Sequence, residues 1–77
     1  MTQPEWRSIF ADNLITIMRE QDMTQSRLAK DSGLSVSRIN DYIYKRATPT
    51  IFAIINLAYA LNVEVNELVD FDDRIES

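Results

Sequence analysis

The sequence predicts an all-α domain, a compact bundle of five helices. The chain has one glycine and two prolines in 77 residues, which leaves few residues for sheet turns or long loops. Hydrophobic residues make up 45% of the chain, enough for a single small core, and apolar side chains recur at helical spacing. The centre of the prediction is a pair of short helices on either side of Gly33.

The first predicted helix ends near Glu20. Its apolar residues return every three or four positions and share one face: Trp6, Ile9, Phe10, Leu14, Ile17 and Met18. Pro4 and Glu5 suit a helix start, because proline needs no partner there and a carboxylate favours the positive end. We expect residues 1–4 to form a flexible tail and residues 5–71 to form the domain. The apolar face belongs to the core, although Trp6 is also placed to touch a second subunit.

The next two helices are predicted from Gln25 to about Ser32 and from Val36 to about Tyr44. Thr24 and Ser35 precede them as N-caps, and Gly33 supplies a backbone with positive φ between them. Apolar residues fit the inside of a packed corner: Leu28, Ala29, Leu34, Ile39 and Tyr42. This is a helix-turn-helix pattern.

The fourth predicted helix, residues 51–61, is apolar on almost every side. Thr50 caps it, Asn62 ends it, and a short helix at 65–69 brings Leu68 back to the core. One stripe can serve the core: Ile51, Ile54, Leu57, Ala58 and Leu61. A second stripe has no use in a monomer and predicts a dimer contact: Phe52, Ile55 and Tyr59. Phe71 either closes the core or joins this contact.

The net charge of −4 is unevenly distributed. Residues 24–50 carry five basic and two acidic side chains, whereas residues 1–23 and 51–77 are both net acidic. The basic segment therefore coincides with the helix-turn-helix pattern, which favours an anionic partner despite the overall charge. We expect residues 72–77 to form an acidic tail, which serves either to lower nonspecific affinity for such a partner or to keep the chain in solution.

Several classes of function lack their signatures. There is no cysteine or histidine, no phosphate-binding glycine loop and no nucleophile motif, so we expect neither an enzyme nor a metal or other cofactor. No small-molecule ligand is evident. The N-terminus lacks the pattern of a signal peptide, and the apolar runs are too short to cross a bilayer. We expect a cytoplasmic protein without membrane contact.

The motif also resembles a known family. Counted from Gln25, the small residue Ala29 is fifth, Gly33 ninth, Ile39 fifteenth and Tyr42 eighteenth. With its flanks, the stretch from about Phe10 to Val69 resembles the Cro/repressor (Xre-like) helix-turn-helix family. The resemblance implies a five-helix bundle of the lambda-repressor-like type. It further implies a homodimer that binds a palindromic operator in double-stranded DNA, and we expect a repressor.

The resemblance assigns DNA contacts residue by residue. Gln25 is expected to meet a phosphate and to buttress the recognition helix. Base-reading positions correspond to Val36, Ser37 and Asp41, flanked by Arg38 and Asn40. The predicted DNA surface also takes in Ser35, Tyr44, Lys45 and Arg46.

The chemistry of these side chains leaves alternatives open. Val36 can pack on a thymine methyl group, and Ser37 can hydrogen-bond to several bases. Arg38 can reach a guanine or a phosphate. Asp41 can accept from a cytosine amino group, or pair with Arg38 or Lys45 on the helix surface.

Two positions depart from the family pattern. Lys45 stands where a glycine usually ends the recognition helix, so it either adopts a left-handed backbone or lets the helix end differently. Ile43 replaces a residue that is usually polar.

Two alternatives to a DNA regulator remain: an antitoxin-type or accessory protein with a protein partner, and an interaction module that has lost DNA binding.

Overall fold

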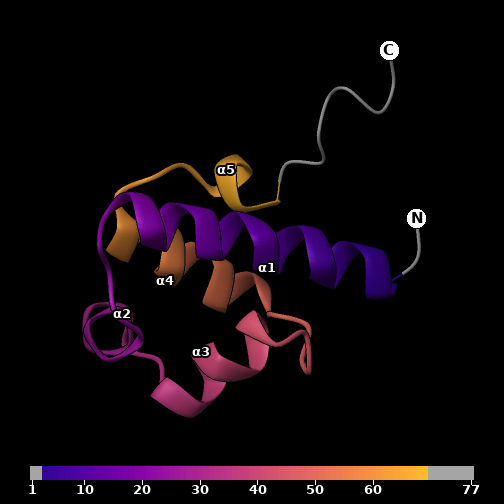
Figure 1. Ribbon diagram of the computed structural model, residues 1–77, viewed down its shortest axis with the longest axis horizontal. Helices are drawn as coiled ribbons and strands as arrows, with labels where there is room; N and C mark the ends of the chain where they lie inside the picture. The colour runs from indigo at the N-terminus through magenta and orange to yellow at the C-terminus, as the bar shows by residue number, and fades with distance from the viewer. Residues whose placement is uncertain (1–2, 70–77) are drawn as a thin grey trace.

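The computed structural model describes residues 3–69, with side chains from Trp6 onward. This part of the chain forms five helices and no strand, which confirms the all-α prediction (Figure 1). The helices are α1 (Gln3–Glu20), α2 (Gln25–Ser32), α3 (Val36–Ile43), α4 (Ile51–Leu61) and α5 (Val65–Val69).

The first helix begins earlier than expected. Gln3 opens α1, so Pro4 lies in the first helical turn and not in a tail. Proline is tolerated there because amides of the first turn have no partner within the helix. Phe71 and the acidic residues 72–77 lie outside the described residues.

Three hydroxyl side chains start three of the helices. Thr24, Ser35 and Thr50 each have an extended backbone and accept a hydrogen bond from the amide three residues later. The donors are the backbone amides of Arg27, Arg38 and Ala53. The predicted N-caps are therefore confirmed, and with them the starting points of α2, α3 and α4.

Left-handed residues end the same helices. Gly33 (φ 79°) follows α2 and Asn62 (φ 59°) follows α4, as predicted. After α3 the chain passes through Tyr44 before Lys45 adopts φ 63°, so the lysine takes the left-handed position usually given to glycine. Asp22, with φ 53° in the link between α1 and α2, is a further left-handed residue that the sequence did not predict.

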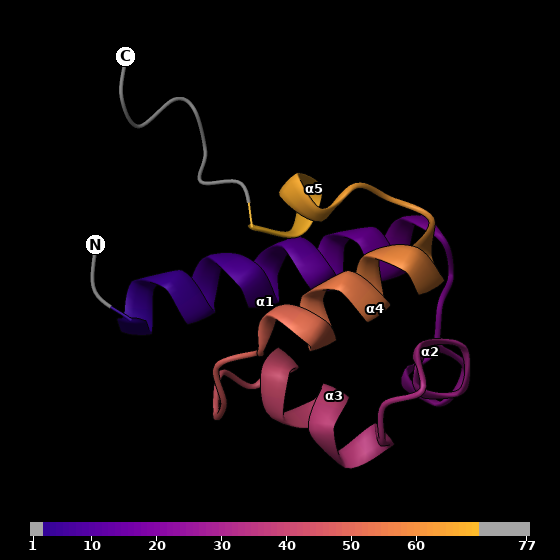
Figure 2. The same ribbon diagram turned by 180° about the vertical axis from the view of Figure 1, so that it is seen from behind.

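All five helices contribute side chains to one core, in which α1 packs against α3 and α5 while α2 packs against α3 and α4. The largest fully buried side chains come from all five helices: Phe10, Leu14, Leu28, Ile39, Tyr42, Leu57, Leu61 and Leu68. Figures 1 and 2 show α5 on one side of α1 and α3 on the other. Two amide side chains, one in α1 and one directly after it, donate to backbone carbonyls of the C-terminal part: Asn13 Nδ2 to Leu68 O (2.8 Å) and Gln21 Nε2 to Leu61 O (2.7 Å).

One core assignment in α4 was wrong. Ile51 is 59% exposed, whereas Ala53 is buried in its place. The buried face of α4 runs through Ala53, Leu57 and Leu61, which leaves Ile51 at its border beside Phe52. The other predicted core residues of α4 are buried, so the spacing identified the inward face; because nearly every side chain of α4 is apolar, no polar residue marked the border of that face at Ile51.

Aromatic rings anchor α3 to α1. The ring of Tyr42 in α3 meets that of Phe10 in α1 edge-on, with centroids 5.9 Å apart. Trp6 stacks on the Phe10 ring, with the two ring centroids 5.8 Å apart, so it packs against the core and is half-buried. In the described part of the chain, no helix combines the length and apolarity needed to cross a bilayer.

Candidate nucleic-acid interface

The third helix has one buried and one exposed face. Ile39 and Tyr42 are buried in the core, as predicted. Val36, 44% exposed, lies with Ser37 and Arg38 in the first turn, where all three face solvent. A helix that is anchored on one side and exposed along its N-terminal turn can enter a major groove and present these side chains to base edges.

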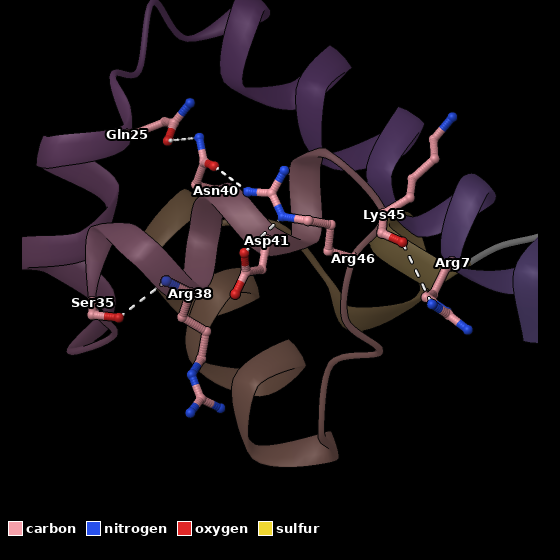
Figure 3. A network of polar contacts seen from close by, with 8 residues as sticks. All are labelled: Arg7, Gln25, Ser35, Arg38, Asn40, Asp41, Lys45 and Arg46. Atoms are coloured by element: carbon pink, nitrogen blue, oxygen red, sulfur yellow. Dashed lines mark hydrogen bonds and ion pairs between the residues drawn. The ribbon is translucent and has the colours of Figure 1, made fainter.

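A chain of hydrogen bonds links α2, α3 and the following loop (Figure 3). Asn40 Nδ2 donates to Gln25 Oε1 at 3.3 Å, so Gln25 supports the recognition helix as expected. Arg46 then donates twice: its Nη2 to Asn40 Oδ1 at 2.6 Å and its Nε to Asp41 Oδ1 at 3.1 Å. The guanidinium carbon also lies 5.2 Å from the centroid of the exposed Tyr44 ring.

The ion pairs differ from those that the helix spacing allowed. Within residues 3–69, Asp41 pairs with neither Arg38 nor Lys45 but with Arg46. The left-handed turn at Lys45 explains this, because it brings the chain back so that the Arg46 amide donates to the Asp41 carbonyl at 2.8 Å. Figure 3 shows the Arg38 side chain pointing away from this network, where it remains available to a ligand.

The loop after α3 also contacts α1. Lys45 Nζ lies 3.9 Å from Asp12 Oδ1, with both side chains largely exposed. Arg7 Nη1 donates to the carbonyl of Lys45 at 3.4 Å, which adds a third cation near Lys45 and Arg46 (Figure 3). Arg7 was missed from the sequence because it lies 38 positions before its partner, on a helix assigned to the core.

The predicted interface residues therefore form two groups. The predicted DNA-contact side chains gather on α3, the start of α2 and the loop after α3; Ser35 among them is occupied as the N-cap of α3. The predicted dimer residues lie apart on α4, where Phe52 is 75%, Ile55 47% and Tyr59 87% exposed. Ile51 extends this apolar surface.

Comparison with known proteins identifies the family and structures with a similar fold. A family model described as helix-turn-helix matches residues 14–68, more than half of the chain. No curated protein sequence matches. The structure is similar to that of the restriction-modification controller protein C.AhdI from Aeromonas hydrophila. The TM-score is 0.74 and the identity 29%, over 77% of this chain and 89% of that chain.

A second solved structure has the same fold. It is that of a hypothetical transcription factor, NHTF, from Neisseria. The TM-score is 0.85 and the identity 22%, over 99% of this chain and 88% of that chain. The matched family region contains both helices of the motif and the loop that carries Lys45 and Arg46. The protein therefore belongs to the helix-turn-helix family of DNA-binding regulators.

Proposed function

We propose that the protein is a cytoplasmic, sequence-specific repressor that binds a palindromic operator as a homodimer. The observation that carries this proposal is the exposed face of α3, which lies beside the loop that contains Lys45 and Arg46. The first turn of α3 takes no part in the core. A helix face that does not pack on the core is free to contact a ligand. The neighbouring Lys45 and Arg46 are positively charged and can bind a polyanion.

The proposed binding mode divides the work between two kinds of contact. The exposed side chains of α3 enter the major groove and read bases. Gln25 at the start of α2 and Lys45 and Arg46 after α3 contact phosphates beside that groove. Phosphate contacts supply most of the affinity, and the recognition helix supplies the specificity.

The exposed apolar surface of α4 supports the proposal of a dimer. Four large side chains form it: Ile51, Phe52, Ile55 and Tyr59. Surfaces of this kind on small soluble domains commonly mark a contact with another chain. In a two-fold dimer the two copies of α3 would lie about 34 Å apart, one turn of DNA, and would read the two halves of a palindrome. A repressor bound there excludes polymerase.

Selection from a random duplex library tests the proposal. Purified protein at physiological salt is expected to enrich a two-fold symmetric motif with half-sites about ten base pairs apart. A single unsymmetric half-site would contradict the dimer and retain DNA reading. If the folded protein enriches no motif, the proposal fails, and the apolar surface of α4 then favours a protein partner. Transcription from a promoter that carries the motif distinguishes repression from activation.

A further inference from the structure

The Arg46 guanidinium is held on several sides before any ligand arrives. Asp41 binds its Nε, Asn40 binds its Nη2, and the Tyr44 ring lies against its face. A free arginine on a loop would instead lose considerable side-chain entropy on binding a ligand. Two of the five guanidinium N–H groups are occupied by these contacts, which leaves three for an incoming phosphate.

Asn40 already uses both ends of its amide. Its oxygen accepts from Arg46 and its nitrogen donates to Gln25, so it spans the gap between the loop after α3 and the start of α2 (Figure 3). An asparagine that reads adenine needs the same two groups for the base, one as acceptor and one as donor. Each end keeps one further hydrogen-bonding site, but the two bonds fix the direction of the amide, so Asn40 is oriented by Gln25 and Arg46 and not by a base.

Asp41 is committed in a similar way. Its Oδ1 accepts from Arg46 Nε at 3.1 Å, and its backbone carbonyl accepts from the Arg46 amide. A carboxylate this close to a proposed phosphate contact would repel the phosphate if it were left unpaired. Pairing with Arg46 removes that cost and fixes the direction of the guanidinium.

We propose that Asn40 and Asp41 are positioning residues for Arg46, and that neither reads a base. Asn40 positions Gln25 as well, so one side chain aligns two proposed phosphate contacts, one before and one after α3 in the chain. Base specificity then belongs to the first turn of α3: Val36, Ser37 and Arg38. This inference rests on the proposed function and changes its division of labour, because Asn40 and Asp41 leave the set of base-reading residues.

A double-mutant comparison tests the role of Asn40. In the otherwise unchanged protein, Asn40→Ala is expected to weaken operator binding between about twofold and tenfold, the effect of one or two lost hydrogen bonds. In a Gln25→Ala, Arg46→Ala background, measured at about 50 mM salt to keep binding detectable, the same change is expected to have no effect. An undiminished loss in that background overturns the inference. Asn66→Ala on the exposed side of α5 is the matched control.

Library selection gives a second, independent readout. Asn40→Ala and Asp41→Asn are both expected to select the same motif as the unchanged protein, because an amide oxygen at position 41 still accepts from Arg46. A changed preference at a single base pair by either variant identifies a base-reading residue and overturns its assignment. Ser37→Ala, by contrast, is expected to change one base pair and shows that the assay detects such changes.

The contacts can also be followed without DNA. In the free protein, the Arg46 Nε–H is expected to give a distinct NMR signal that exchanges slowly with water, and Asn40→Ala is expected to speed its exchange. If the Arg46 Nε–H of the unchanged protein exchanges rapidly with water and gives no distinct signal, the inference is overturned. That result would not contradict DNA binding. A protein that binds no DNA but retains the slow signal refutes the proposed function, and the positioning role falls with it, although the contacts exist.

Discussion

Replacing Lys45 by glycine should stabilise the fold. Lys45 has φ 63°, a conformation that costs an L-residue roughly 1–2 kcal/mol and glycine nothing. Glycine gives back about 0.5–1 kcal/mol of this gain, because it adds entropy to the unfolded chain. We therefore expect the Lys45→Gly variant to be more stable than the Lys45→Ala variant by about 0.75 kcal/mol, the midpoint of the difference between these two ranges. The backbone contacts of Lys45, to the Tyr42 carbonyl and from Arg7, survive either change.

Lys45→Ala is the necessary reference for this comparison. Both variants lose the 3.9 Å pair with Asp12, whose side chain is 69% exposed, so its loss costs at most a few tenths of a kcal/mol. The difference between the two variants thus isolates the backbone conformation. In urea unfolding, the glycine variant should have a higher midpoint than the alanine variant at an unchanged slope. In thermal unfolding, its melting temperature should be higher by about 2–8 °C.

The outcome that refutes the reasoning is a glycine variant no more stable than the alanine variant. The left-handed backbone would then carry no strain at this position. DNA binding provides a second comparison, because both variants lose the same cation. Each is expected to reduce the dependence of affinity on salt by about one unit of slope, and to the same extent.

Five further substitutions test separate parts of the structure. Gly33→Ala should lower the free energy of unfolding by about 1 kcal/mol, measured in urea, through backbone strain alone, because an added Cβ would meet no atom within 4 Å. Tyr42→Phe should keep or raise stability by up to about 1 kcal/mol, since the buried hydroxyl has no partner among the described residues; a larger loss would reveal one. Phe52→Glu should shift sedimentation toward monomer, and an unchanged profile would rule out the α4 contact. Arg46→Ala should weaken binding to all sequences alike, whereas Ser37→Ala should alter selection at one base pair; the reverse pattern would contradict the assignment.

Local signals in the sequence predicted the fold well. Thr24, Ser35 and Thr50 start helices because a hydroxyl satisfies a free amide, and Gly33 and Asn62 end them because each tolerates positive φ. These effects act within a few residues and can be read without knowing the tertiary structure. The error at Ile51 shows the limit, since a helix that is apolar on almost every side has no polar residue to mark the border of its buried face.

The candidate site was predicted less completely. The exposed turn of α3 followed from subtracting the buried face, and the support of α3 by Gln25 came from the family resemblance. The partners of Asp41 could not be predicted in the same way, because helix spacing offered Arg38 and Lys45 with equal reason. The pairing with Arg46 depends on the turn at Lys45, and the contact of Arg7 depends on how α1 crosses α3. Both are consequences of tertiary structure.

The division of α3 into an anchored face and an exposed turn has a consequence for evolution. Ile39 and Tyr42 hold the helix in place, while Val36, Ser37 and Arg38 contribute little to folding. Substitutions at such exposed positions usually change stability by less than about 0.5 kcal/mol. If these three positions read bases, as proposed, a descendant of this protein can acquire a new target sequence by single substitutions without first acquiring a more stable scaffold, and duplicated copies can diverge in specificity while the bundle stays the same.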